Sequence, residues 1–205
     1  MDPFGIIHIL EPPILPDIVN QVWFLLIIFL FYYFNLVRLK LFVFLLVTAF
    51  LPFLINDIVF PISYMPDQYK YFIWAYNLRN LTSESTQWST MSVAGFEIAR
   101  PNAKYFTTII YAYFPIPFIS SVISISIINR IIYTVMIILS VHYKIIKGKI
   151  VLFFLLFPGL ILYSSIALRE ILVLFLMLGS AYCLIYKRYL YIIPFLIVLF
   201  LIKFQ

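Results

Sequence analysis

Long apolar runs alternate with short polar turns along most of the chain. Six runs are typical of membrane-spanning helices: 18–37, 41–60, 122–142, 150–168, 171–186 and a last run that starts at 189. About 20 residues that rise about 1.5 Å each cover about 30 Å, which is the thickness of a bilayer's hydrocarbon core. The pattern predicts an all-α fold: a polytopic transmembrane bundle with about six spans, forming a single domain over residues 1–205.

Two apolar stretches do not fit this pattern because prolines interrupt them. Residues 1–17 contain four prolines, so we expect an interfacial lead-in there and not a span. Residues 105–121 contain Pro115 and Pro117 and precede the third span directly. We expect this stretch to be a re-entrant or interfacial helix that does not cross the bilayer, so that residues 105–142 cross it once.

The long polar segment of the chain is the loop 61–104, which contains two of the three tryptophans. Within this loop, aromatic and aliphatic residues recur at helical spacing between 68 and 81. We predict a short amphipathic helix there, lying on the membrane surface, and a turn at 82–87. The predicted apolar face consists of Tyr69, Phe72, Ile73 and Tyr76.

Composition supports the membrane class and excludes several others. The chain is 65% hydrophobic and 11% charged, with a mean hydropathy of +1.09, too few charges to cover a soluble domain of this size. Its net charge of +6 does not indicate nucleic acid, because basic residues at helix ends first report orientation. The single cysteine, Cys183, excludes an intrachain disulfide. No metal-ligand cluster, phosphate-binding glycine loop or serine-hydrolase motif is present in the sequence.

The ends of the chain carry two further indications. No Lys or Arg occurs in the first 17 residues, so the sequence does not predict a cleavable signal peptide. The last residues, LIVLFLIKFQ, are still apolar, so we expect a piece of a longer protein.

Charge predicts the orientation. The turns 38–40, 144–149 and 187–188 hold seven basic residues and no acid, whereas all eight acids fall on the other side. Basic turns favour the cytoplasm. The loop 61–104 and the Arg169-Glu170 turn are then extracytoplasmic.

Two carboxylates near the end of the second span are candidates for chemistry. Asp67 precedes the predicted surface helix, where it either acts as a general base for an incoming hydroxyl or holds a divalent metal ion on a diphosphate. It is equally a residue type that begins helices. Asp57 lies in the apolar end of the span. It either binds substrate, or the span ends earlier and its carboxylate is exposed to water.

Basic residues supply candidate substrate contacts. Arg169 and Glu170 lie in a connection so short that both are held at the membrane face; Arg169 suits diphosphate binding, and Glu170 is a candidate acid, base or orienting group. The alternative without a function is a charged turn whose side chains extend into water. Arg130, near the middle of the third span, needs a partner or a polar cavity. Arg79, in the loop, adds positive charge that attracts an anionic lipid carrier.

Three stretches resemble membrane glycosyltransferases of the GT-C class and bacterial O-antigen and exopolysaccharide polymerases. They are PDQYKYFIWAYNLRN, FPIPFISSVISISIINRIIYTVM and FPGLILYSSIALREILVLFLMLGSAYCLIYKR, in this order along the chain. The resemblance implies a polyprenyl-linked sugar, undecaprenyl or dolichyl, transferred on the outer face. Asp67 then matches the loop carboxylate, and Arg169 with Glu170 the charged turn. The chain departs from that pattern by an extra span before the loop.

The sequence therefore predicts a membrane glycosyltransferase or polysaccharide polymerase of the bacterial inner membrane. A non-enzymatic transporter or flippase is the alternative, with Asp57, Arg130 and Glu170 along a substrate path. The expected partners are the bilayer and a polyprenyl-phosphate-linked sugar, without nucleic acid.

Overall fold

The computed structural model describes residues 14–56, 58–59, 67–80, 88–93, 96–101 and 105–203, and these residues are mainly helical. In chain order the helices are α1 (Ile14–Tyr33), α2 (Leu39–Thr48), α3 (Leu51–Ile55), α4 (Asp67–Arg79), α5 (Tyr105–Ala112), α6 (Val122–His142), α7 (Lys149–Leu156), α8 (Pro158–Tyr163), α9 (Glu170–Ile185) and α10 (Tyr189–Lys203). Asp57 lies outside the described residues, as do the lead-in 1–13 and the turn 82–87.

Each predicted run forms helix, and the second and fourth runs form two shorter helices each. Two helices in the described residues, α1 from Leu15 and α6, are long and apolar enough to cross a membrane, and α6 has the predicted bounds. The second and fourth runs are each divided into two helices, at Pro52 and at Pro158, which both lie in the first turn of the second piece. Proline tolerates that position because its missing N–H is not needed there, yet it interrupts the preceding helix.

The described residues confirm an all-α fold, to which one small hairpin is an exception. Strands β1 (Trp88–Val93) and β2 (Phe96–Pro101) pair antiparallel, with Met91 opposite Ile98 and Val93 opposite Phe96. These apolar pairs are two positions apart, which is the period of a strand. This alternation of apolar residues is the sequence sign of a hairpin, and the prediction of a helix in loop 61–104 did not take it into account.

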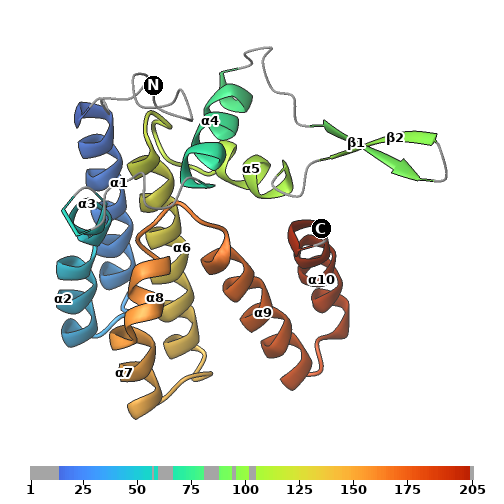
Figure 1. Ribbon diagram of the computed structural model, residues 1–205. Helices are drawn as coiled ribbons and strands as arrows, with labels where there is room; N and C mark the ends of the chain where they lie inside the picture. Colours follow the sequence, from blue (N-terminus) through green and yellow to red (C-terminus); the bar gives the residue numbers. More distant parts are fainter. Residues whose placement is uncertain are drawn as a thin grey trace.

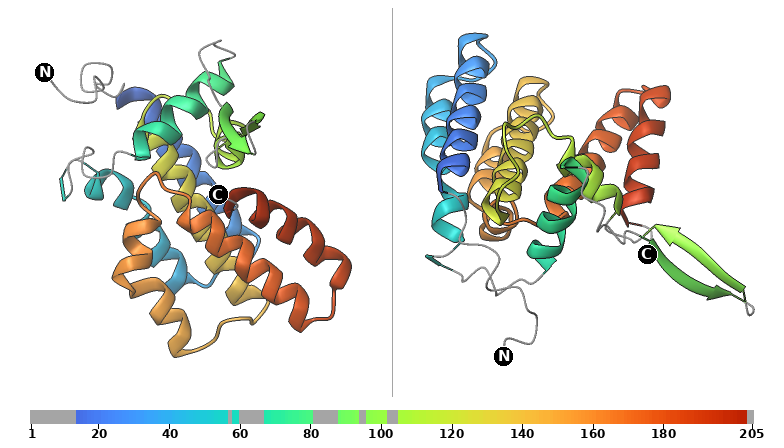
Figure 2. Two further views of the ribbon diagram at one scale, coloured as in Figure 1. Left: turned by 45° about the vertical axis from the view of Figure 1, so that its right-hand side comes forward. Right: turned by 90° about the horizontal axis from the view of Figure 1, so that it is seen from above.

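The helices form three antiparallel pairs, α1–α2, α6–α7 and α9–α10, whose connecting turns all lie at the same end of the molecule (Figure 1). Helices α4 and α5 lie across the opposite end, and the views in Figure 2 show α6 between the other pairs. Helix α6 is buried along nearly its whole length. It therefore forms the centre of the hydrophobic core.

The three turns share one backbone construction. Each has a residue in the left-handed region just after the helix: Asn35 (φ 55°), Lys144 (φ 57°) and Lys187 (φ 55°). In each, the N–H groups of that residue and of the next one bond to helix carbonyls three and five residues back, at 2.8–3.1 Å. This is a Schellman ending, which glycine normally occupies because a Cβ atom is crowded there. Two of the three turns carry lysine at that position.

We expect Lys187→Gly to stabilise the fold by about 0.5–1 kcal/mol, because glycine relieves the left-handed strain. Arg188→Gly is the matched control: it removes the same charge one residue later, where φ is not positive, and should give no gain. Thermal unfolding in detergent measures both. Equal stabilisation by the two variants would attribute the effect to charge.

Candidate functional site

A buried turn, residues 164–168, connects α8 to α9 inside the helical structure. Ser164, Ser165, Ile166 and Ala167 are each 3% exposed or less. The turn is not helical. Nearby carbonyls accept from the N–H groups of Ser164, Ser165 and Leu168, and the remaining N–H and C=O groups need partners from elsewhere. Inside a membrane protein such backbone is tolerated only where protein or water satisfies it.

Asn129 of α6 provides the largest share of those partners. Its Nδ2 donates to the carbonyl oxygens of Ile166 at 2.7 Å and Leu168 at 2.6 Å. The hydroxyl of Tyr111, on α5, lies 2.8 Å from both Asn129 Oδ1 and the Leu168 oxygen. One amide thus ties the turn to two helices.

Three further side chains complete what we call the polar hub, the set Asn56, Gln68, Tyr111, Asn129 and Arg130 around the buried turn. Asn56 Nδ2 donates to the Ser165 carbonyl at 2.9 Å, and Gln68 Oε1 accepts from the Ala167 N–H at 2.8 Å. Arg130 Nη1 donates to Ser164 Oγ at 2.5 Å. Side chains from α4, α5, α6 and the end of α3 therefore converge on one turn.

The turn lies deep within the bundle, at some distance from the end at which α6 begins. Asn129, which binds it, follows Val122 by seven residues, so the turn is about 10 Å along α6 from where that helix begins. Arg169 and Glu170 follow the turn directly and start α9 at this depth.

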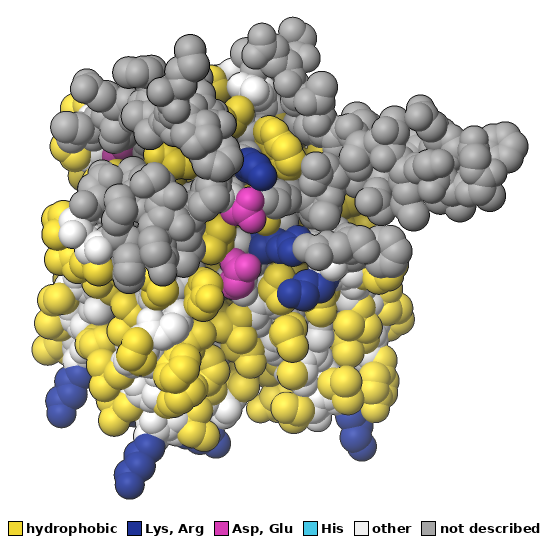
Figure 3. All heavy atoms as spheres, viewed as in Figure 1, with side chains coloured by type: hydrophobic (Ala, Val, Ile, Leu, Met, Phe, Trp, Pro, Cys, Tyr) yellow, Lys and Arg dark blue, Asp and Glu magenta, His cyan; other side chains and the backbone are white. Residues whose placement is uncertain are grey.

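Three predicted site residues, Asp67, Arg169 and Glu170, lie near enough to Tyr71 for their charges to affect its phenol. Burial raises the pKa of the Tyr71 phenol far above its ordinary value; Arg169 lowers that pKa, whereas the charges of Glu170 and Asp67 raise it further. Asp67 Oδ1 also lies 3.6 Å from Lys70 Nζ, and both side chains are about half exposed. Acidic and basic side chains gather in the upper half of this face, whereas basic ones alone occupy the lower end (Figure 3).

Arg169 has a contact that the sequence did not predict. Its Nη1 donates to the Ile202 carbonyl in the last turn of α10 at 3.0 Å. Cations favour that position because the last helical carbonyls are unpaired. The contact fixes one edge of the guanidinium while the side chain stays half-buried.

Arg130 and Arg79 lie apart from this cluster. Arg130 is 2% exposed, its Cζ is 5.3 Å from the Tyr133 ring centre, and its Nε has no partner among the described residues. Arg79 Nη2 donates to the carbonyls of Ile116 at 2.7 Å and Pro117 at 3.2 Å. The contacts described for Arg79 therefore connect α4 to the irregular segment 113–121.

The buried face of α4 is displaced from the predicted one, with Phe72 common to both and with Tyr69 and Ile73 partly buried against the core. Its buried residues are Gln68, Tyr71, Phe72 and Ala75, whereas Tyr76 of the predicted face is 42% exposed. Gln68 and Tyr71 were missed because a polar residue and a tyrosine both resemble solvent-facing positions. Their spacing of three residues was the available signal.

A second buried polar cluster surrounds Asp17, which we expected in the interfacial lead-in. Asp17 lies instead in the first turn of α1 and is 1% exposed. Ser121 and Ser124 hydroxyls donate to its carboxylate at 2.8 Å, and Ser121 also begins α6 by accepting from the Ser124 N–H. A carboxylate at a helix N-terminus complements the helix dipole. Asp17 therefore fastens α1 to the start of α6.

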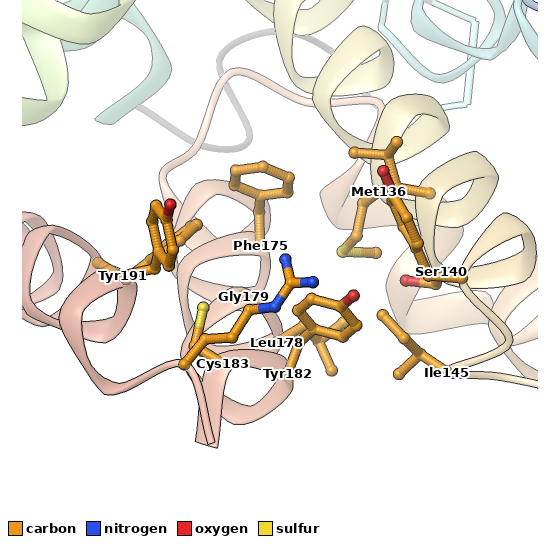
Figure 4. Close-up of a pocket in the computed structure, with 13 residues that line it drawn as sticks. Met136, Ser140, Ile145, Phe175, Leu178, Gly179, Tyr182, Cys183 and Tyr191 are labelled. Carbon is orange, nitrogen blue, oxygen red and sulfur yellow. The ribbon is translucent and has the colours of Figure 1, made fainter. Parts of the chain in front are cut away.

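An apolar cavity of about 280 Å³ lies between α6, α9 and α10. Figure 4 shows Met136, Phe175 and Leu178 around it, and Tyr143, Ile145 and Arg188 of the basic turns also line it. It belongs to the end of the bundle opposite the polar hub. Across the described residues, no three Asp, Glu, His or Cys side chains gather in a way that would hold a metal ion.

Comparison of the chain with family models, with curated proteins and with solved structures found no match.

We expect Asn129→Leu to destabilise the protein by about 1–3 kcal/mol, because a side chain with the same branching but without an amide leaves the Ile166 carbonyl unpaired. Ser180→Ala is the control, since that buried hydroxyl bonds only its own helix, to Leu176 O at 2.9 Å. Chemical unfolding in detergent measures both variants. An equal loss of stability would show that Asn129 has no special role.

Proposed function

We propose that this chain belongs to a multi-pass integral membrane protein of about six spans in a bacterial inner membrane, with its basic turns in the cytoplasm. The single domain then covers residues 1–205. The arrangement in Figure 3 supports this, because apolar side chains cover the flank of the bundle and basic ones mark one end. Helices α1 and α10 also expose large apolar side chains, such as Phe29 and Leu190, that lipid would cover.

Asn80→Cys and Lys147→Cys test the orientation in a Cys183→Ala background. Both positions are exposed, and they lie after α4 and before α7. In intact cells an impermeant maleimide should label Asn80→Cys, and it should label Lys147→Cys only after the membrane is opened. Labelling of both positions from one side would contradict the topology.

For its activity, we propose transfer of a sugar from a polyprenyl diphosphate carrier on the outer face, as in a glycosyltransferase or polysaccharide polymerase. The observation that carries the proposal is that Asp67, Arg169 and Glu170 all lie near enough to Tyr71 for their charges to affect its phenol, on α4 and at the start of α9, away from the basic turns (Figure 1). A guanidinium and two carboxylates near one half-enclosed site suit an anionic leaving group beside a general base.

Each of these side chains has a separate task in the proposed reaction. Asp67 takes the proton of the acceptor hydroxyl while that oxygen bonds to the anomeric carbon. The bond from this carbon to the diphosphate breaks, and Arg169 holds the departing polyprenyl diphosphate. Glu170 orients Arg169 or serves as a second acid or base. A divalent metal ion on the diphosphate, with Asp67 as one ligand, is the alternative task of Asp67.

One observation favours transport as the second candidate. Asp17 and Arg130 are charged side chains buried inside the described bundle, and such groups frequently line substrate paths. Two serines bind Asp17 in a structural role, so Arg130 is the residue that supports a substrate path. Transport without sugar transfer that is lost in Arg130→Met would favour it.

Activity should depend on Asp67 and on the shape of Arg169. We expect Asp67→Asn to lower transfer by about 10²–10⁴-fold, because a general base is lost, without loss of folding. Arg169→Lys keeps the charge but loses the planar pair of donors, so it should also impair transfer. Cells that lack the gene, complemented with each variant and assayed for polymer or lipid-linked sugar, provide the measurement.

Arg188→Lys is the matched control for the arginine, because it makes the same exchange at the opposite end of the bundle. It should leave transfer unchanged. Normal product from Asp67→Asn would remove that carboxylate from the site.

A further inference from the structure

A second cavity, which we call the basic pocket, lies between the α1–α2 pair and the α6–α7 pair at the end with the basic turns. Its volume is about 630 Å³, within the usual range for ligand sites. Arg38, Lys40 and Lys144 line it, together with an apolar wall. The wall includes Leu41, Phe44, Val141, Val151 and Leu155.

The three cations come from turns that are about 100 residues apart in the chain, so the fold itself brings them together. All three are exposed, and none has an ion pair within the described part of the chain. Like charges around one cavity repel each other and raise the local positive potential. An anion in the pocket removes that repulsion.

The apolar wall restricts the chemistry of that anion. Val151, Leu155 and Phe44 belong to helices that lead from the turns toward the middle of the bundle. A free inorganic anion would leave this wall uncovered, whereas an amphiphile would place its charged head at the turns and its chains along the helices. Basic pockets between membrane helices on the cytoplasmic side suit anionic lipid head groups.

We propose that the basic pocket binds an anionic phospholipid with two phosphates, from the leaflet that faces the basic turns. Three cations match two phosphates better than one. This inference rests on the membrane insertion proposed above, but it does not depend on sugar transfer. The 280 Å³ cavity is a useful contrast, since Arg188 is the only cation among its lining residues.

The test uses the purified full chain in neutral detergent, with cardiolipin, phosphatidylcholine or a polyprenyl diphosphate added. Native mass spectrometry gives the fraction of protein that retains lipid, and thermal unfolding gives the shift caused by lipid. The pocket variant combines Arg38→Gln with Lys40→Gln. The control combines Lys187→Gln with Arg188→Gln, which removes two charges from the equivalent turn outside the basic pocket.

We expect cardiolipin retention and its thermal shift to fall several-fold in the pocket variant and to stay near the wild-type value in the control. Retention of phosphatidylcholine should be low in all three proteins. An equal loss in both variants would overturn the proposal, because it would show a general effect of the basic end. Stronger retention of a polyprenyl diphosphate than of cardiolipin would also overturn it and assign the pocket to that carrier.

A pocket variant that does not fold would be replaced by Lys144→Gln, which removes the third cation from the other turn and carries the same expectation. Extraction of cell membranes with carbonate separates the two proposals. Release of the chain by carbonate would contradict membrane insertion, whereas an inserted chain without cardiolipin preference would contradict the lipid site alone.

Discussion

The buried, non-helical backbone of residues 164–168 is the constraint on which the rest of this structure depends. An N–H or C=O group without a hydrogen bond costs several kcal/mol of folding free energy in an apolar interior. The chain meets this demand with single side chains from separate elements, of which Asn129 makes two bonds and Gln68 one. These bonds also determine where α4 and α5 lie, since Gln68 and Tyr111 reach the turn from those helices.

The candidate site is a consequence of that arrangement. Gln68 binds the turn at Ala167, so its neighbour Asp67 is carried toward Arg169 and Glu170, which follow the turn. The positions of Asp67, Arg169 and Glu170 therefore do not depend on the conformation of a long loop. Arg169 is held in addition by the end of α10, through Ile202. The polar hub therefore acts as the support, and the charged residues lie at its edge.

Much of this could be predicted from apolar run lengths and charge, because both are local in sequence. The bounds of α6 and the basic turns belong to this group, and the divisions at Pro52 and Pro158 follow from the local effect of proline. The buried face of α4 and the position of Asp17 could not be predicted. They depend on which carbonyls and hydroxyls meet across the fold, and such partners lie up to 109 residues apart, as in the bond from Asn56 to Ser165.

The two buried charges in the described bundle, Asp17 and Arg130, do not pair with each other. Each has serine hydroxyls as partners. Asp17 accepts from Ser121 and Ser124, while Arg130 donates to Ser164. Ser121 and Arg130 are nine residues apart on α6, or about 13 Å, which is too far for an ion pair. A hydroxyl both donates and accepts, so one residue type satisfies either sign of charge. Because the two charges are satisfied separately, a ligand or a proton that changes one of them leaves the described contacts of the other intact, and the start and the middle of α6 respond independently.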